Sequence, residues 1–341
     1  MKAAVIERFG PPEVLSICDV PLPSVGPSDV LVRTKAIGLN FADIFARLGY
    51  YPSIPRPPFI PGIEVSGVIE QKGSAVRDLK TGDRVVVFTR QKGYAEYVSV
   101  PSGQVGRIPR RMGFREAAAF GVTSLTAWHG LVTLGNMKKG EHVLLHAAAG
   151  GVGTASLQLA RHAGAVVHAT VGSNAKMNIV ASLGAETVTN YTEDDFAEPV
   201  RRATDGHGVD IVFDSVGGRV FRRGWKLLAP MGRYVLYGFA AVAGEKGVGK
   251  MRAARESLSM PLIFPPSLVS KNKSLTGFNL YFLMQEAEYL RKALKNLFAL
   301  YERGVLKPVI GAEYPFERIV EAHRFLQSRK SIGKVVLTLN S

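Results

Sequence analysis

Residues 142–162, HVLLHAAAGGVGTASLQLARH, join an apolar run to a second apolar run of helical periodicity through a group of small residues. Ala147, Gly150 and Gly153 are spaced three apart at the expected change from strand to helix. The first permits a tight turn, the second lets the backbone approach a pyrophosphate, and the third lets the helix pack closely on the strand. Because a strand-like run precedes this turn and a helix-like run follows it, the pattern predicts dinucleotide binding and not only a structural turn.

Strand-like and helix-like runs alternate from about residue 120 onward. Such alternation is typical of a doubly wound parallel sheet, which is an α/β fold. We expect the run RYVLYGF, residues 233–239, to form the last strand of this sheet. A long helix is expected at about 284–303, and a strand at IGKVVLTL near the end of the chain.

The first 115 or so residues show a different pattern, with short β-type runs separated by turns rich in glycine and proline. These runs include VLVRTKAIGL, VSGVIEQKG, DRVVVF and YAEYVSV, and they predict a small all-β domain. The proline cluster PSIPRPPFIPG, residues 52–62, fits neither a helix nor a central strand. We therefore expect an extended loop there.

Charge and cysteine content narrow the classes of function. The formal net charge is +15, but lysine and arginine are spread along the whole chain, which disfavours a nucleic acid as partner and leaves a membrane surface open. The single cysteine, Cys18, is too few for a disulfide framework or a cysteine-rich zinc site. We find no apolar stretch of transmembrane length and no secretion signal, and we expect a cytoplasmic location.

The strand after the glycine turn indicates which dinucleotide binds. Enzymes that use NAD usually place Asp or Glu about twenty residues further on, where the carboxylate binds the ribose hydroxyls. The corresponding stretch here, ATVGSNAK, has no acid but offers Ser173 and Lys176 beside Gly172. Serine and lysine bind a 2′-phosphate, which a carboxylate would repel. The sequence therefore favours NADPH as the cofactor.

Motifs along the whole chain match one family pattern: GLNFADIFARLGYY, PGIEVSGVIE, GDRVVVF, AAAFGVTSLTAW, HAAAGGVG, NYTEDDF, VDIVFDSVGG and IGKVV. With these motifs the chain resembles the medium-chain dehydrogenase/reductases, specifically the zinc-independent quinone oxidoreductase family. The stretches LLAPMGRYVLYG, TGFNLYFL and LFALYERGVLKPVIGAEYPFERI look most like its vesicle amine transport protein branch. The resemblance implies a GroES-like catalytic domain of residues 1–121 and 272–341, and a Rossmann NADPH-binding domain of residues 122–271.

This chain departs from the zinc-dependent relatives at two positions. They carry a cysteine in the segment GLNFAD and a histidine in PGIEVSG, where this chain has Asn40 and Ile63. Neither residue supplies a thiolate or an imidazole, so we expect no catalytic zinc. Without a metal to stabilise an alkoxide, the acceptor has to spread the incoming charge over its own π-system. We therefore predict hydride transfer from NADPH to a quinone or an activated alkene (enone).

Two other functions stay open. One is an NADPH-binding interaction protein, acting on a membrane surface or RNA with incidental turnover. The other is an enoyl reductase of polyketide or lipid assembly. Residues 240–273, with a glycine-rich cationic first half and an apolar second half, bear on this choice. We expect them to form a mobile cover over the substrate cleft, whereas exposure of the apolar half would indicate an interaction surface.

The resemblance also implies roles for individual residues and a homodimer joined through edge strands of two Rossmann sheets. Asn40, at the nicotinamide ribose or the substrate oxygen, and Tyr51, at the mouth of the cleft, are the expected catalytic residues. Phe45 stands where some quinone reductases have tyrosine, which puts a two-tyrosine mechanism in doubt. Lys334 is expected to add a second cation near the 2′-phosphate. The expected cofactor-binding residues are Asn40, Thr126, Gly150, Gly151, Val152, Gly153, Ser173, Lys176, Tyr191, Ser215, Tyr237, Gly238, Phe278, Asn279 and Lys334.

Overall fold

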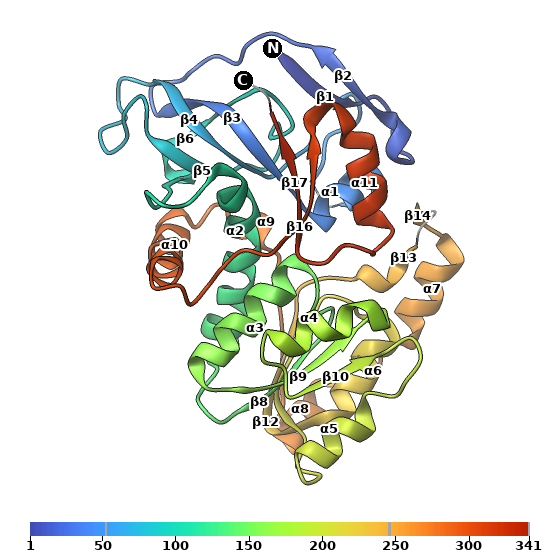
Figure 1. Ribbon diagram of the computed structural model, residues 1–341. Helices are drawn as coiled ribbons and strands as arrows, with labels where there is room; N and C mark the ends of the chain where they lie inside the picture. The colour runs from blue at the N-terminus through green and yellow to red at the C-terminus, as the bar shows by residue number, and fades with distance from the viewer. Residues whose placement is uncertain (52, 245–246, 340–341) are drawn as a thin grey trace. The chain divides into compact units, whose positions relative to one another are not determined.

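The computed structural model describes residues 1–51, 53–244 and 247–339. The chain divides into two compact units, which Figure 1 shows in the colours of the chain. The first unit contains Met1–Leu125 and Leu280–Ser341, and the second contains Thr126–Asn279. The predicted α/β class is confirmed, with one unit built on antiparallel pairing and the other on a parallel sheet.

The first unit is built on a sheet of strand order β16–β17–β3–β4–β5–β7, in which β6 also pairs with β3, and on a separate antiparallel pair of β1 and β2. The strands are β1 (Lys2–Ile6), β2 (Leu15–Asp19), β3 (Asp29–Leu39), β4 (Glu64–Lys72), β5 (Arg84–Phe88), β6 (Tyr97–Pro101), β7 (Val105–Arg107), β16 (Ile310–Pro315) and β17 (Lys334–Thr338).

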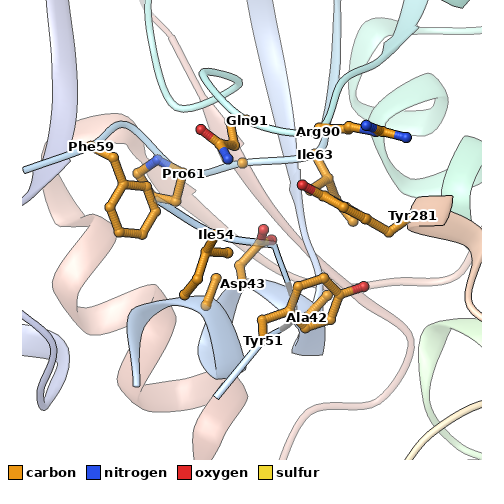
Figure 2. A pocket seen from close by; sticks show the side chains of 12 residues that line it. Ala42, Asp43, Tyr51, Ile54, Phe59, Pro61, Ile63, Arg90, Gln91 and Tyr281 are labelled. Carbon is orange, nitrogen blue, oxygen red and sulfur yellow. The ribbon is translucent and has the colours of Figure 1, made fainter. Parts of the chain in front are cut away.

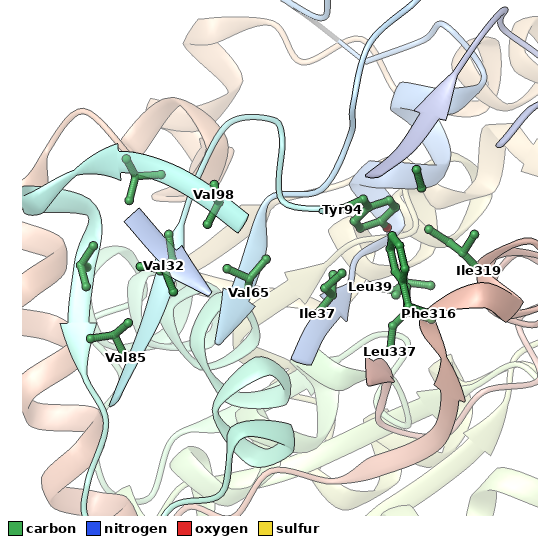
Figure 3. Close-up of a cluster of buried hydrophobic side chains, with 14 of the residues drawn as sticks. Val32, Ile37, Leu39, Val65, Val85, Tyr94, Val98, Phe316, Ile319 and Leu337 are labelled. Atoms are coloured by element: carbon green, nitrogen blue, oxygen red, sulfur yellow. The ribbon is translucent and has the colours of Figure 1, made fainter. Parts of the chain in front are cut away.

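The hydrophobic core of the first unit joins the two ends of the chain. Val32, Ile37 and Val65 from the early strands pack in one cluster with Phe316 and Leu337 from the C-terminal tail (Figure 3). Strand β17 pairs antiparallel with β3, and Leu337 lies opposite Ile37. The tail therefore completes the β-rich unit, as predicted. Residues 53–62 contain no helix, in line with the predicted loop, while residue 52 lies outside the described residues.

The first unit contains the helices α1 (Phe41–Arg47), α2 (Phe114–Ala127, whose last two residues belong to the second unit), α9 (Leu280–Leu283), α10 (Ala287–Glu302) and α11 (Ile319–Gln327). Helix α2 continues into a π-helical turn at Trp128–Leu134. The combined segment Phe114–Leu134 is long and apolar enough to cross a membrane, which the sequence reading had not found. Its apolar window is 78% buried inside the protein, as in the core helix of a soluble domain.

The second unit is built on a parallel sheet of strand order β10–β9–β8–β11–β12–β15. Its order reverses beside β8, which is the arrangement of dinucleotide-binding folds. The strands are β8 (His142–Leu145), β9 (Val166–Val171), β10 (Thr187–Asn190), β11 (Val209–Asp214), β12 (Leu228–Leu236) and β15 (Ser274–Gly277), with a short pair β13 (Ala243–Gly244) and β14 (Gly247–Val248). The helices are α3 (Gly151–Ala163), α4 (Met177–Ser182), α5 (Ala197–Ala203), α6 (Gly218–Leu227), α7 (Lys250–Ser259) and α8 (Pro265–Lys271).

The edge of this sheet differs from the prediction. Strand β15 pairs with the outer side of β12, so the run RYVLYGF is not the last strand. The predicted domain border at residues 271 and 272 would cut β15 away from its sheet, and the two units in fact separate at Asn279 and Leu280. Strand β15 has four residues and follows helix α8 closely, and it gave no alternating signal of its own.

Residues 240–273 are predicted to cover the substrate cleft, and this role stays a prediction. Helix α7 packs on α6, with Arg222 donating to the carbonyl of Ser259 at 2.6 Å and the backbone N–H of Arg219 donating to Glu256 at 3.3 Å. Four large side chains between Leu258 and Val269 are 69 to 102% exposed, whereas Met260 and Ile263 pack against the core of the second unit. The structure thus shows the four side chains as an exposed apolar face, and residues 245 and 246 lie outside the described chain. The exposed side chains are Leu258, Leu262, Phe264 and Val269.

Candidate cofactor and substrate site

The glycine turn after β8 has the geometry of an anion-binding helix start. Gly150 is the N-cap of α3 and, lacking a side chain, leaves the first turn without a side-chain cap. A Cβ on Gly150 would meet only the carbonyl oxygen of Ala147, at 3.4 Å, so the space beside this backbone is open. A Cβ on Gly153 would lie 2.4 Å from the carbonyl oxygen of Ala148, which explains why helix and strand require glycine there. The residues present therefore fit a pyrophosphate at the N-terminus of α3.

The first small residue of this turn takes an unusual conformation. Ala147 has a φ of +53°, in the left-handed region that favours glycine. The strain of an alanine in this conformation is held by neighbouring backbone bonds, since Gly150 N–H donates to the Ala147 carbonyl at 3.0 Å and Ala148 N–H to the Thr170 carbonyl at 3.0 Å. The predicted tight turn is confirmed.

The residues predicted around the adenosine phosphate gather at the carboxyl ends of β9 and β10. The Lys176 backbone N–H donates to the Ser173 carbonyl at 3.1 Å, and Tyr191 N–H donates to the Val171 carbonyl at 3.0 Å. The Tyr191 hydroxyl would lie 3.1 Å from a Cβ on Gly172, so this ring covers the glycine. The side chains of Ser173, Lys176 and Tyr191 thus belong to one corner of the sheet.

Sequence reasoning missed an amide and an acid beside this corner. Asn174 donates to the carboxylate of Glu193 at 2.9 Å and accepts from the side chain of Asn190 at 3.0 Å. Glu193 is exposed and comes from the loop after β10, not from the end of β9. It therefore does not stand in the position of the acid that binds ribose hydroxyls in NAD enzymes.

A second group of predicted residues lies at the carboxyl ends of β11, β12 and β15. The rings of Tyr237 and Phe278 stack with centroids 6.0 Å apart. A Cβ on Gly238 would lie 2.9 Å from the carbonyl oxygen of Ser215, so these backbones touch. Burial raises the pKa of Tyr237 above its ordinary value, and a hydrogen bond from Ser215 opposes that shift. Thr126, buried near the end of α2, and Asn279, at the end of the unit, also belong to this unit.

His129 also belongs to this group, although no motif in the sequence indicated it. Its ring meets the edge of Phe278 at a centroid distance of 4.7 Å. It lies in the π-helical turn, whose wider hydrogen-bond spacing has no sequence signature. Burial lowers the pKa of His129, which favours the neutral imidazole.

In the first unit, Asn40 is the N-cap of α1 and all of its amide groups have partners. Its side-chain oxygen accepts from Lys334 Nζ at 2.5 Å, and its amide nitrogen donates to the Gly38 carbonyl at 3.0 Å and to Glu64 at 3.4 Å. The backbone N–H of Asp43 donates to the main-chain carbonyl of Asn40 at 3.0 Å. An asparagine side chain offers two donors and two acceptor sites. The catalytic role of Asn40 stays a prediction.

Lys334 has different surroundings from those predicted. Its ammonium lies 2.8 Å from Glu64 in an ion pair whose side chains are 4% and 0% exposed. Glu64 is held further by the backbone N–H of Val122 at 2.6 Å. The positive charge of Lys334 is thus balanced inside the protein, and the structure gives no support to a contact with the 2′-phosphate.

Asp43 is a buried carboxyl group that the sequence reading did not single out. It accepts from the backbone N–H of Asn40 at 2.8 Å. Burial raises the pKa of Asp43 to about 7, outweighing the hydrogen bonds from Asn40 and Tyr94 that lower it. The Tyr94 hydroxyl also contacts His323 at 3.1 Å, and Arg47 contacts the other nitrogen of that ring at 3.0 Å.

Tyr51 lines a pocket in the first unit together with Tyr281 and Arg90 (Figure 2). The two tyrosine rings meet edge to face at a centroid distance of 5.3 Å, and the Arg90 guanidinium lies 5.4 Å from the centre of the Tyr281 ring. Phe45 contacts Phe41, at 5.6 Å, and is not among the lining residues. The pocket is lined by Ala42, Asp43, Ala46, Tyr51, Ile54, Phe59, Pro61, Gly62, Ile63, Arg90, Gln91 and Tyr281.

Comparisons with known proteins agree with this architecture. Residues 26–110 match the family model of the alcohol dehydrogenase GroES-like domain, and residues 183–337 match that of the zinc-binding dehydrogenases. The chain has the two parts of a medium-chain dehydrogenase/reductase. One is a β-rich unit completed by the C-terminal tail, and the other is a parallel sheet that carries the glycine turn.

Relatives along the full chain identify the family. The rat synaptic vesicle membrane protein VAT-1 homolog is 37% identical over 99% of this chain and 84% of its own length. The quinone oxidoreductase of Lama guanicoe is 34% identical over 99% of this chain and 98% of its own. The solved structure of Escherichia coli quinone oxidoreductase complexed with NADPH is 30% identical, with a TM-score of 0.88 over 99% of this chain and 100% of that one. The chain belongs to the quinone oxidoreductase family of medium-chain dehydrogenase/reductases, in which the VAT-1 homologues form a branch.

Proposed function

We propose that this protein is an NADPH-dependent reductase that transfers a hydride to a quinone or a conjugated enone without a catalytic zinc. The proposal depends on two features that occur together in this chain. The glycine turn at α3 is open, and Asn40 and Ile63 stand at the positions where zinc-dependent relatives have zinc ligands. Bound NADPH supplies the hydride. A quinone or enone delocalises the charge that it receives, and so needs no Lewis acid.

The residues of the second unit are proposed to bind and orient the cofactor. The N-terminus of α3, with Gly150, Gly151, Val152 and Gly153, holds the pyrophosphate. Ser173, Lys176 and Tyr191 hold the 2′-phosphate at the ends of β9 and β10. Tyr237 and Phe278, with Ser215, Gly238, Thr126 and Asn279, flank the nicotinamide. The stacked rings of Tyr237 and Phe278 support this assignment, because they offer a flat apolar surface.

The residues of the first unit are proposed to receive the acceptor. Tyr51 lines the pocket beside Tyr281, and its hydroxyl is the proposed donor to the acceptor oxygen. Asn40 is proposed to hold the start of α1 through its backbone N–H on Asp43, to hold the Lys334 ammonium through its side-chain oxygen, and to contact the ligand. Phe45 offers no hydroxyl, so the proposed mechanism assigns no role to a second tyrosine at that position.

A panel of acceptors tests the proposal. NADPH oxidation should be followed with ortho-quinones, para-quinones, enones and enoyl thioesters, with and without the protein. We expect turnover with quinones or enones, because their π-systems accept hydride without a metal. Turnover confined to enoyl thioesters would instead support an enoyl reductase, and no turnover with any acceptor would contradict the proposal.

Metal content gives a further test. Chelator-treated protein should contain no stoichiometric zinc by elemental analysis and should keep its rate with the best acceptor, because Asn40 and Ile63 supply no zinc ligand. Among the described residues, no group of three or more His, Cys, Asp or Glu side chains is arranged to hold a metal ion. One tightly held zinc per chain after chelation would contradict the prediction.

We also propose a homodimer formed through β15, which replaces β12 as the edge of the Rossmann sheet. Leu275 on β15 is 37% exposed, and the apolar face between Leu258 and Val269 lies in the segment that leads into this strand. An exposed parallel edge with an apolar neighbour favours pairing with another chain. A membrane surface is the competing partner, favoured by the same exposed side chains, and the cytoplasmic location stays a prediction.

Light scattering at micromolar concentration tests the dimer. For the parent protein we expect twice the chain mass of 36.9 kDa. The variant Leu275→Lys places a charge on the edge strand, and we expect it to have the mass of a single chain. Phe9→Lys, at an exposed phenylalanine of the first unit, is the control and should keep the dimer. A monomeric parent protein that binds anionic vesicles would favour the membrane surface instead.

A further inference from the structure

The pocket of the first unit combines apolar walls with one guanidinium. Ile54, Phe59 and Ile63 supply apolar surface, and Arg90 stands at the side of Tyr281 (Figure 2). Arg90 is partly buried, and its guanidinium packs on the Tyr281 ring at 5.4 Å. Stacking on an aromatic ring fixes the plane of a guanidinium while leaving the N–H groups at its rim to bind other partners.

Arg90 lies over the Tyr281 ring in the pocket, without a charged partner among the described residues. Within the part of the chain that the structure describes, Arg90 has no carboxylate partner and no hydrogen-bond acceptor. A guanidinium keeps its charge in proteins and carries five donors, so a partly buried one without an acceptor is suited to an anionic ligand. Arginines that do pair with a carboxylate are Arg33, Arg107, Arg115, Arg233, Arg318 and Arg324.

The other acid in the pocket does not neutralise Arg90. Asp43 lines the same pocket, but its carboxyl group is turned to the start of α1, where it accepts from Asn40 N–H at 2.8 Å, and it interacts with Tyr94. No ion pair between Asp43 and Arg90 forms among the described residues. The pocket thus presents an edge-to-face aromatic pair, Tyr51 and Tyr281, with a positive charge on one side.

We propose that Arg90 binds a carboxylate or phosphate group carried by the acceptor, while the planar unsaturated part of the acceptor packs against Tyr51 and Tyr281. The inference rests on the proposed function, and it narrows the substrate class to anionic quinones or enones. Gln91 also lines the pocket (Figure 2). The Arg90 contact fixes the orientation of the acceptor, because a charge-assisted hydrogen bond is stronger than the apolar contacts around it.

Matched acceptors test this inference. The acceptors are three derivatives of benzalacetone, which carry a para-carboxylate, the methyl ester of that carboxylate, or a para-phosphate. The carboxylate and the phosphate show which of the two anions the protein prefers. We expect a kcat/KM for at least one anionic form roughly tenfold or more above that of the ester, and Arg90→Gln should remove the difference. Arg90→Lys should keep part of it. Arg77→Gln, at an exposed arginine of the same unit that does not line the pocket, should keep all of it.

A binding measurement separates this inference from the proposed function. Saturation-transfer NMR should show the anionic compounds binding to the protein with NADP+, and weaker binding to Arg90→Gln. If no acceptor is turned over but this difference in binding is present, the proposed function fails and the anion site stands. Equal kcat/KM values for anionic and ester forms in the parent protein, or an equal loss for all of them in Arg90→Gln, would overturn the inference.

Discussion

NADPH should bind at least roughly tenfold more tightly than NADH, and Lys176→Ala should remove most of this preference. The physical reason is the corner formed by Ser173, Lys176 and Tyr191 at the ends of β9 and β10, where no carboxylate stands at the end of β9. Losing one charge-assisted contact to a phosphate costs about 1.5–3 kcal/mol. Fluorescence titrations of both cofactors with both proteins give the four dissociation constants needed.

Two controls make this cofactor test specific. NADH has no 2′-phosphate, so its affinity should change little in Lys176→Ala. Lys138→Ala removes an exposed lysine of the same unit away from the corner, and its NADPH affinity should match that of the parent. Equal affinities of the parent protein for NADPH and NADH would show that the missing acid does not determine the choice of cofactor.

The sequence predicted the parts of the molecule that depend on local pattern. Each of these parts can be predicted from one element and its neighbours in the sequence. They are the glycine turn, the alternation of strands and helices, and the short β runs. Gly153 is an example, since its need for glycine follows from the carbonyls of Ala147 and Ala148 in the turn just before it. For the same reason Ser173, Lys176 and Tyr191 were found together, because consecutive strands of a parallel sheet end at one edge.

The missing parts depend on contacts between distant residues. Lys334 and Asn40 are 294 positions apart, and nothing near Lys334 in the sequence indicates that its charge is balanced by Glu64. Strand β15 was missed because a short edge strand carries almost no periodicity, and that error moved the domain border. Arg90 was not singled out, because only its place over Tyr281 distinguishes it from other arginines.

Breaking the buried pair of Glu64 and Lys334 should cause the largest loss of stability in the first unit. Lys334→Met leaves the Glu64 carboxylate, which is 0% exposed, without its cation, and removing one partner of a buried pair costs about 3–5 kcal/mol. The same substitution frees the oxygen of Asn40 from its ammonium partner and loosens the start of α1. Hydrogen exchange of the β3 and β17 peptides should report the loss, because both tryptophans, Trp128 and Trp225, lie in the second unit.

The double variant Glu64→Gln/Lys334→Met distinguishes the charge from the packing. If the loss in Lys334→Met comes from an unpaired buried charge, removing that charge as well should restore much of the protection, since replacing both members of a buried pair is often close to neutral. Arg115→Met breaks the exposed pair with Glu313, whose side chains are 62% and 37% exposed, and should cost at most about 1 kcal/mol. If the double variant is as unstable as Lys334→Met, the lost stability comes from the packing of the lysine side chain and not from its charge. The ion pair would then not be what holds Asn40 at the start of α1.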